Sequence, residues 1–213
     1  MVAFFKKIKI SYGITVCDEA VELDALLNSL IPFLKTRDEI IVLRDMTRSS
    51  KNVELVLEKY NHHIKIIEKK LNGDFSSFKN NLISEAKGDY LFQIDADEIP
   101  QKSLLQKLRF LLRIKNKYDC FGVPRINTVE GITPEYIKKW NWTTNEKNYI
   151  NYPDYQMRLF KLNKGIRWDN KVHEVLVGFE RQKLLPADKF DLCLIHTKKL
   201  DKQIRQNEFY ESL

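Results

Sequence analysis

Cysteine is scarce in this chain of 213 residues. Its three cysteines, Cys17, Cys120 and Cys193, are far apart, and no two of them form a Cys-X-X-Cys pair. An odd number of widely spaced cysteines supports neither a disulfide framework nor a zinc knuckle. We therefore expect three core thiols.

Long apolar runs are also missing. No stretch approaches the roughly 20 residues needed to cross a bilayer, and the N-terminus shows no signal-peptide pattern. Repeats and low-complexity segments are absent, and 43% hydrophobic with 31% charged residues is typical of a globular chain. We expect one domain over residues 1–213 in the cytoplasm, with peripheral contact at the inner face of a membrane left open.

A glycine-rich phosphate loop does not follow the first expected strand, which argues against a nucleotidyltransferase of the kind that uses one. The net charge is +7 and the pI is about 9.1, so a polyanionic partner suits the chain. The lysines are scattered and form no basic tail, so a nucleic-acid-binding module is the weaker alternative, and we expect no nucleic-acid partner.

Hydrophobic periodicity predicts alternating strands and helices in the first half. The expected strands cover residues 8–16, 39–43, 63–68 and 90–94. Between them, apolar residues at helical spacing predict three helices, the first with Asp18 as N-cap, and a further helix opens at Ile99-Pro100. Such an order requires a mostly parallel sheet with helices on both faces, and ligands of such sheets bind at the carboxyl ends of the strands.

The second half is less regular. Strands are expected over residues 120–126, 155–162 and 192–195, and residues 200–213 resemble an amphipathic closing helix. Residues 130–153 read as a long aromatic loop, and loops of that length are usually functional or mobile.

Carboxylates gather where the fourth strand ends. Asp95, Asp97 and Glu98 directly follow the apolar run after Gly88, which we interpret as the cap of the preceding helix. Crowded like charges repel unless a cation is present, and Mg²⁺ or Mn²⁺ bound by one or two carboxylates is usually completed by water and phosphates. The alternative is a solvated acidic turn.

Taken together, these segments resemble the family 2 glycosyltransferases of the GT-A fold. The resemblance rests on Gly88 to Glu98, Ile41 to Asp45, Phe78-Lys-Asn and, further on, Gln156-Met-Arg-Leu-Phe and Val172-His-Glu. Asp18 replaces the family's usual asparagine, and residues 46–50 depart from its Gly-Ser-Thr-Asp run. The expected fold is α/β, a mostly parallel central sheet flanked by helices, with a smaller mixed or antiparallel C-terminal part.

The resemblance implies a metal-dependent, inverting transfer of a sugar from a nucleotide-diphosphate sugar to the hydroxyl of a glycan, lipid-linked or protein acceptor, in synthesis of surface polysaccharide, lipopolysaccharide or glycoconjugate. Residues 1–100 would bind the nucleotide and residues 101–213 the acceptor. The donor would contact Thr15, Asp18, Glu19, Asp45, Lys79, Asp95 and Arg158. A DXD-type segment would bind Mn²⁺ or Mg²⁺ through Asp95 and Asp97, with His196 as a further ligand.

An inverting transfer also needs a base that takes the acceptor's proton. The resemblance points to Glu174, with His173 as its rival or orienting partner. Lys198, Lys199 and Arg205 either close over the diphosphate or form a solvated helix face. The aromatic side chains Trp140, Trp142, Tyr149 and Tyr155 either stack on an acceptor sugar or pack the far edge of the sheet.

Overall fold

The computed structural model describes residues 7–211 of the chain. Its first half alternates strands and helices as the periodicity predicts. The elements are β1 (Ile10–Val16), α1 (Ala20–Leu30), β2 (Glu39–Asp45), α2 (Lys51–Lys59), β3 (Ile64–Lys69), α3 (Phe75–Glu85) and β4 (Tyr90–Asp95). A short 3₁₀ turn, Ile31–Phe33, extends α1.

The second half adds a mixed parallel and antiparallel extension to this unit. Its elements are β5 (Ile99–Pro100), α4 (Lys102–Ile114), β6 (Cys120–Glu130), α5 (Pro134–Lys139), β7 (Ile150–Lys161), β8 (Arg167–Asp169), β9 (Val175–Val177), β10 (Gln182–Leu184), a 3₁₀ turn (Phe190–Leu192), β11 (Leu194–Lys199) and α6 (Leu200–Glu211). The expected end of the last helix at residues 212–213 lies outside the described residues.

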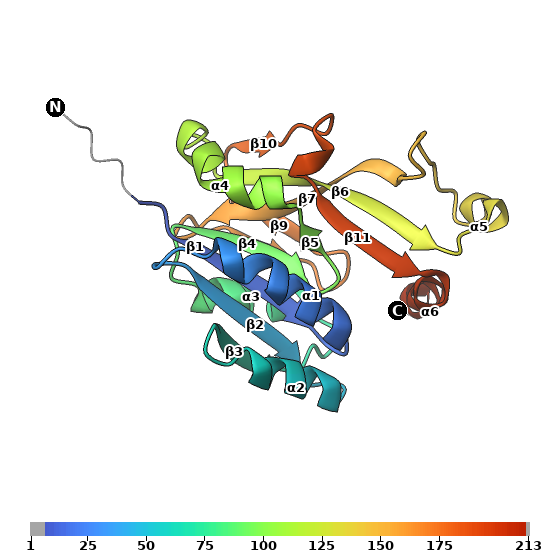
Figure 1. Ribbon diagram of the computed structural model, residues 1–213, viewed down its shortest axis with the longest axis horizontal. Helices are drawn as coiled ribbons and strands as arrows, with labels where there is room; N and C mark the ends of the chain where they lie inside the picture. The colour runs from blue at the N-terminus through green and yellow to red at the C-terminus, as the bar shows by residue number, and fades with distance from the viewer. Residues whose placement is uncertain (1–6, 212–213) are drawn as a thin grey trace.

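One large sheet carries both halves, in the order β3-β2-β1-β4-β7-β6-β11-β5 (Figure 1). The first four of these strands run parallel, β7 is antiparallel to both β4 and β6, and β8 and β9 form a separate small antiparallel sheet. In the β1–β4 register Thr15 lies opposite Asp95, so the polar ends of neighbouring strands meet at one edge. The expected fold class is confirmed.

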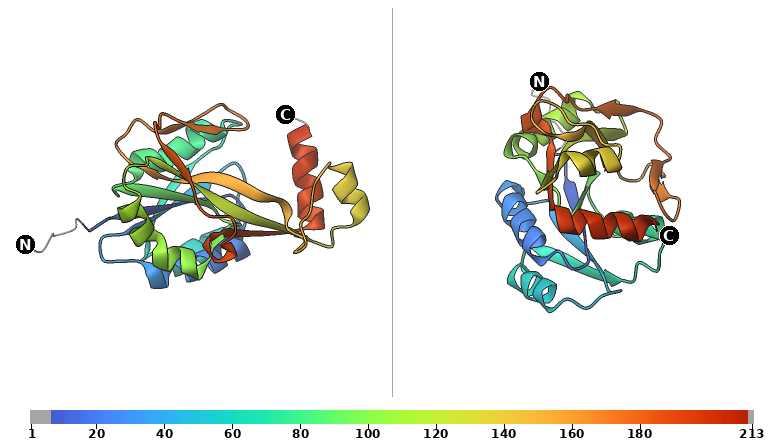
Figure 2. Two further views of the ribbon diagram at one scale, coloured as in Figure 1. Left: turned by 90° about the horizontal axis from the view of Figure 1, so that it is seen from above. Right: turned by 90° about the vertical axis from the view of Figure 1, so that its right-hand side faces the viewer.

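Helices cover both faces of the sheet, which buries the strands on two sides (Figure 2). The leucines of α1 at 23, 26, 27 and 30 are buried with α2 and α4 on one face, as their spacing predicts. On the other face α3 packs Phe78 and Leu82 against Trp168 of β8. The sheet is therefore rigidly held, and its strand ends are well-defined positions for functional side chains.

Three local expectations were wrong. Ile99-Pro100 opens no helix but forms β5, which pairs with β11, and α4 begins two residues later. Asp18 does not cap α1; the N-cap is Glu19, whose carboxylate instead accepts hydrogen bonds from the backbone of Cys17 and Asp18. No side chain therefore caps the first turn of α1.

Gly88 is not a left-handed helix cap either. A Cβ built on it would lie 2.8 Å from the backbone nitrogen and the hydroxyl of Ser11, and Gly88 itself donates to that hydroxyl. Close approach of the chain to β1, not a positive φ, is what requires glycine here.

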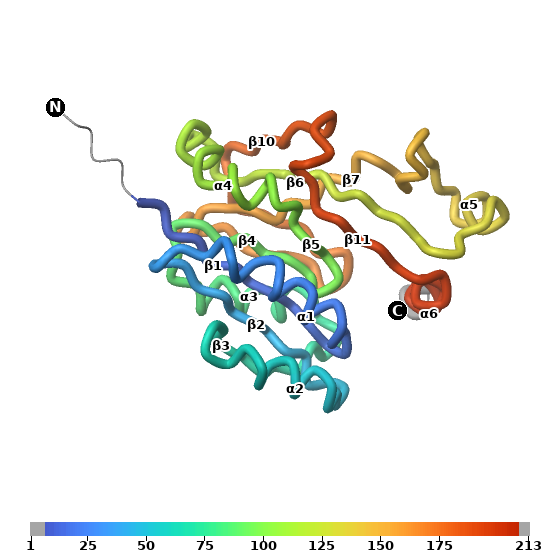
Figure 3. Tube along the Cα trace, in the orientation of Figure 1, coloured from blue at the N-terminus to red at the C-terminus, as the bar shows by residue number. Residues whose placement is uncertain are grey.

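The long aromatic segment is more ordered than its composition predicts. It contains α5, and β7 begins at Ile150, inside the expected loop. Figure 3 traces this segment as an arm that leaves the sheet beyond β6 and returns along β7. None of the helices within residues 7–211 combines the length and apolar character that a membrane crossing requires.

Candidate active site

A cavity of about 540 Å³ opens at the carboxyl ends of β1, β2 and β4, and we call it the strand-end pocket. Its lining includes Thr15, Asp45, Lys79, Asp97, Glu174 and His196. Glu19, Asp95, Arg158 and His173 line it as well, so the pocket brings together all but one of the residues that the sequence proposes as donor contacts, metal ligands or catalytic base. The exception is Asp18, which is exposed, pairs with Arg48 at 3.6 Å and lines a neighbouring pocket.

Asp45 ends β2 with its side chain turned back onto its own loop. Its Oδ1 accepts hydrogen bonds from the backbone and hydroxyl of Thr47, at 2.9 and 2.6 Å, and from the backbone of Leu71 at 3.0 Å. These bonds join the loops after β2 and β3 into one wall of the strand-end pocket. The second oxygen of Asp45 takes part in none of these bonds.

Asp95 ends β4 within a set of cationic partners. It accepts a hydrogen bond from Thr15 Oγ1 at 2.7 Å, pairs with Arg158, and lies 3.8 Å from Lys79 Nζ. Burial alone would raise the pKa of Asp95, but the charges of Arg158 and Lys79 and the bond from Thr15 bring that pKa well below its ordinary value. Asp95 is therefore a fixed anion.

Glu98 lies below this tip and is wholly buried. Its Oε1 is 2.7 Å from Arg125 Nη1 and 3.0 Å from Arg158 Nη2, and its Oε2 accepts from the backbone of Asp95 at 3.1 Å. Arg158 thus bridges Asp95 and Glu98. Because removing one partner of a buried ion pair is costly, Glu98 holds the two guanidinium groups in place beneath the pocket.

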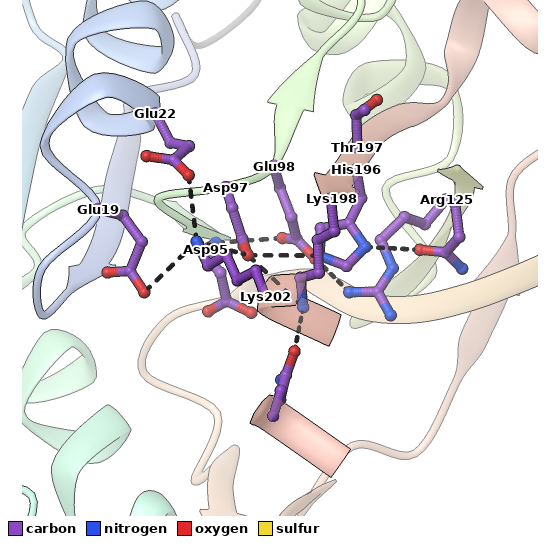
Figure 4. Close-up of polar contacts among 12 residues, drawn as sticks. Glu19, Glu22, Asp95, Asp97, Glu98, Arg125, His196, Thr197, Lys198 and Lys202 are labelled. Carbon is purple, nitrogen blue, oxygen red and sulfur yellow. Dashed lines mark hydrogen bonds and ion pairs between the residues drawn. The ribbon is translucent and has the colours of Figure 1, made fainter. Parts of the chain in front are cut away.

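Asp97 faces the other way, toward β11 and α6 (Figure 4). Its Oδ2 lies 3.4 Å from His196 Nε2, 3.7 Å from Lys198 Nζ and 4.0 Å from Lys202 Nζ. Burial alone would raise the pKa of Asp97, but the hydrogen bond and charge of His196 and the charge of Lys198 lower it below its ordinary value. This carboxylate attracts cations from two further elements.

Asn127 on β6 orients the His196 imidazole, because its Oδ1 lies 2.7 Å from His196 Nδ1, and the other ring nitrogen faces Asp97. Burial, together with the charges of Arg125 and Lys202, lowers the pKa of Lys198 despite the neighbouring Asp97. Lys198 also donates to Gln206 Oε1 of α6 at 2.5 Å. Lys199 is exposed and does not line the strand-end pocket, and Arg205 lines only the pocket beside it.

Lys202 is a residue of this site that the sequence did not single out. It lies 3.1 Å from Glu22 and 4.0 Å from Glu19 as well as 4.0 Å from Asp97, so it connects α6 to the start of α1 (Figure 4). One lysine among 36 basic residues gives no signal in the sequence. Arg125 and Gln206 went unnoticed for the same reason.

Across the pocket, Lys79 on α3 lies 2.5 Å from Glu174 Oε1. Lys79 is buried, and its ammonium group also sits 5.0 Å from the ring of Trp168, whose indole donates to Gln93 at 2.8 Å. Beside Glu174, His173 has a φ of 55°, a left-handed conformation that is uncommon among residues other than glycine. The Val-His-Glu segment is thus held over the strand ends by the buried Lys79.

The four aromatic residues proposed as an acceptor platform or as packing, Trp140, Trp142, Tyr149 and Tyr155, divide into two groups. Trp142 and Tyr155 line a second pocket next to the strand-end pocket, and Trp140 stacks on Trp142 with ring centroids 4.7 Å apart. Tyr149 packs instead against Tyr152 and Phe190. Stacking on an acceptor sugar remains a prediction for Trp142 and Tyr155, whereas Tyr149 makes packing contacts within the chain.

Comparison with solved structures places this geometry in a known fold. The model resembles S. aureus TarS 1-349 in complex with UDP-GlcNAc, with a TM-score of 0.63 and 18% identity over 90% of this chain. It also resembles the mannosyltransferase PcManGT of Pyrobaculum calidifontis in complex with GDP-Man and Mn²⁺, with a TM-score of 0.59 and 12% identity over 90% of this chain. The chain spans 59% and 57% of the lengths of these two proteins.

At these identities the structural likeness concerns the fold. A search of curated proteins finds no match to the sequence. The family model described as glycosyl transferase family 2 matches residues 11–171, about three quarters of the chain. That span includes the ends of β1, β2 and β4, the Asp95 to Glu98 tip and the first residue of the loop before the Val-His-Glu segment. The chain belongs to the family 2 glycosyltransferases.

Proposed function

We propose that this protein transfers a sugar from a nucleotide-diphosphate sugar to an acceptor hydroxyl, in a metal-dependent reaction that inverts the anomeric centre. One observation carries the proposal: Asp95 and Asp97, separated by one residue where β4 ends, both line the strand-end pocket, and each has cationic partners. Ligands of parallel sheets bind at this edge.

The donor's nucleoside would lie along the ends of β1 and β2. Asp45 is held by the backbone of Thr47 and Leu71, so a carboxylate oxygen is presented to a ribose hydroxyl without rearrangement. Thr15 and Glu19 line the same wall, and Lys79 brings positive charge to it from α3. Asp18, from its neighbouring pocket, would contact the donor only at its outer rim.

The residues present fit a divalent metal. Within residues 7–211 no three His, Cys, Asp or Glu side chains form a cluster that could bind a metal alone. Mg²⁺ and Mn²⁺ need only one or two protein ligands when phosphates and water complete the shell, and the Asp97 carboxylate with the His196 imidazole supplies such a pair. Asp95 is engaged by Arg158 and Thr15, so it would act as an anion behind this pair. When bound, the metal would stabilise the charge that develops on the diphosphate.

The proton of the acceptor hydroxyl would go to Glu174 or His173. Both line the strand-end pocket, and Lys79 fixes the Glu174 carboxylate from one side. His173 carries the uncommon left-handed backbone, which the surrounding structure must enforce. Glu174→Gln and His173→Gln separate the two: the variant of the true base loses transfer but retains nucleotide binding.

We further propose that residues 1–100 serve the donor and residues 101–213 the acceptor, in synthesis of a surface polysaccharide, lipopolysaccharide or glycoconjugate. The lining of the strand-end pocket supports this proposal: most of it comes from the first half, and Arg125, Arg158 and His196 of the second half line it where an acceptor would approach.

A thermal-shift panel of nucleoside diphosphates and nucleotide sugars, with and without Mn²⁺, tests the proposal. A ligand that binds only the native state raises the melting temperature. We expect one nucleoside diphosphate to stabilise the chain only when Mn²⁺ is present, and Asp97→Asn to abolish this shift. Asp191→Asn is the matched control, since Asp191 pairs with exposed Lys107 away from the pocket and its variant should behave like the wild type. No stabilisation by any nucleotide, or an undiminished shift in Asp97→Asn, would contradict the proposal.

A further inference from the structure

A second pocket of about 440 Å³ adjoins the strand-end pocket, between the arm of β6 and β7 and the helix α6. The two pockets share Arg125, His196, Lys198 and Gln206. A molecule in the second pocket would therefore extend to the His196 edge of the first. The size suits a small ligand.

The cations that line the second pocket are already engaged. Arg125 pairs with Asp154 through Nε and Nη2, at 2.8 and 2.7 Å. Its Nη1 pairs with Glu98 at 2.7 Å. Lys198 donates to Gln206 and lies beside Asp97. Recognition of a phosphate or carboxylate usually uses a guanidinium or ammonium group free to pair with it. Both Arg125 and Lys198 already have carboxylate neighbours within the chain.

Neutral polar groups and an aromatic wall make up the rest of the pocket. The amide and hydroxyl side chains are those of Asn127, Thr128, Asn151, Gln203, Gln206 and Asn207. Amides both donate and accept, which matches a sugar hydroxyl that does the same. Trp142, backed by Trp140, supplies a flat apolar face, and Tyr155 lies at another side of the pocket. A pyranose ring presents both surfaces at once.

We propose that the second pocket is the acceptor subsite and that it selects an uncharged, hydroxyl-rich sugar residue over a phosphorylated or acidic one. This inference rests on the proposed function, because the hydroxyl to be glycosylated would point from this pocket toward the strand-end pocket. Asp154, the acidic residue among the described lining, is paired in the same way, because its carboxylate accepts hydrogen bonds from Arg125, Asn127 and Gln156.

Saturation-transfer NMR on the full chain tests the inference. The probes are methyl glycosides of glucose, galactose, mannose and N-acetylglucosamine, together with the 6-phosphate of each, in the presence of Mg²⁺ and UDP or GDP. We expect at least one neutral glycoside to bind and its 6-phosphate to bind at least about fivefold more weakly. Trp142→Ala should weaken the neutral probe about fivefold or more, and Trp142→Phe should restore most of the loss.

Thr128→Val provides a second variant that does not depend on the folding of the aromatic arm. It removes one hydroxyl from the pocket, 2.8 Å from the Thr197 hydroxyl, and keeps the side chain's volume. The melting temperature should remain unchanged while binding of the neutral probe falls. Tighter binding of a 6-phosphate, no binding of any neutral glycoside, or full binding in both Trp142→Ala and Thr128→Val would overturn the inference.

The nucleotide in the same samples keeps this failure separate from failure of the proposed function. If UDP or GDP stabilises the chain with metal but no neutral glycoside binds, the acceptor inference alone is wrong. If a neutral glycoside binds through Trp142 and no nucleotide does, the donor assignment fails while the sugar subsite stands.

Discussion

Arg158 is the residue on which the geometry of the strand tip depends most. It is 4% exposed, and its guanidinium lies between Asp95 and the wholly buried Glu98. Burial alone would lower the pKa of Arg158, but the charges of these two carboxylates raise it above the ordinary value for arginine. Without this cation, the half-buried Asp95 and the buried Glu98 would repel each other.

Arg158→Met should therefore lower the free energy of unfolding by about 3–5 kcal/mol, the usual cost of leaving a buried charge uncompensated. Arg48→Met is the matched control, because Arg48 is 69% exposed and its pair with Asp18 is 3.6 Å long. An exposed pair of this kind contributes less than about 1 kcal/mol. Urea unfolding measures the free energy of unfolding of both variants. Equal decreases would show that the buried pairs of Arg158 contribute no more to stability than the exposed pair of Arg48.

Residue types at this site could be read from the sequence, whereas their pairing could not. Asp95 and Asp97 follow a buried strand, so a carboxylate tip was predictable. That Arg158 would reach Asp95 and Glu98 depends on β7 pairing antiparallel to β4, a long-range register that no local pattern encodes. Lys202 lies more than a hundred residues from Asp97 along the chain.

At the scale of elements, β1 and β4 meet where Gly88 leaves no room for a side chain. Gly88→Ala would place a methyl group 2.8 Å from the Ser11 backbone and from the carbonyl of Tyr90. We expect a loss of about 2–3 kcal/mol, since a rigid backbone cannot move aside as a flexible side chain can.

Gly73→Ala is the comparison, because Gly73 has a φ of +70° but nothing within 4 Å of the added carbon. Only backbone strain of about 1 kcal/mol is expected there. Thermal or urea unfolding ranks the two variants. If Gly73→Ala cost more than Gly88→Ala, conformation and not close approach would be the reason for glycine at both positions.

The helix α6 is attached to the rest of the molecule by lysines at its N-terminal end. Lys202 reaches Glu22 of α1 at 3.1 Å, and Lys198 reaches Gln206 of α6 at 2.5 Å. Lys202→Met should therefore speed amide hydrogen exchange across α6 at least severalfold, since loosely attached elements open first. Lys199→Met, at an exposed neighbouring position, should leave this exchange unchanged. Equal protection in both variants would mean that packing alone retains the helix.

Most elements were predictable because their apolar periodicity agrees with the burial they achieve. The helix face of α1 and the central run of β4 are examples. The helix expected at Ile99-Pro100 was wrong because proline, which lacks a backbone N–H, fits the first turn of a helix and also an edge position of a strand. The pairing of these two residues with β11, which no local pattern predicts, makes them a strand. The order inside the aromatic arm arises from hydrogen bonds within it, from Trp142 to Ile137 and from Thr143 to Asn151, and from the packing of Tyr149 on Phe190.

Across the whole molecule, buried carboxylates link stability to pH. Burial alone would raise the pKa of Asp154, but the charge of Arg125 and hydrogen bonds from Asn127 and Gln156 lower it. An unfolded aspartate titrates near about pH 3.9. The contribution of Asp154 is thus complete above that pH and is lost as pH falls toward the lower pKa of the folded state.

Urea unfolding at about pH 5 and about pH 3 should show a larger drop in the free energy of unfolding for the wild type than for Asp154→Asn. The amide cannot be protonated in this range, so its variant lacks this share of the pH dependence. Identical pH profiles would show that Asp154 has the same pKa in the folded and unfolded chain.

The topology of the whole molecule brings the strand-end pocket together, and that much followed from the order of strands and helices. The sharing of its floor between residues from both halves, and the second pocket beside it, required the antiparallel strands β6 and β7 to be placed. Pocket shape depends on those placements, so the second pocket could not be predicted from the sequence.

The most direct test of the central claim is a crystal structure of the full chain with UDP or GDP and Mn²⁺, with anomalous diffraction recorded to locate the manganese. We expect one anomalous peak within about 2–2.5 Å of an Asp97 carboxylate oxygen. The diphosphate should contact the same manganese, and the nucleoside should lie along the ends of β1 and β2. A bound nucleotide whose diphosphate and manganese lie away from Asp97 would contradict the central claim.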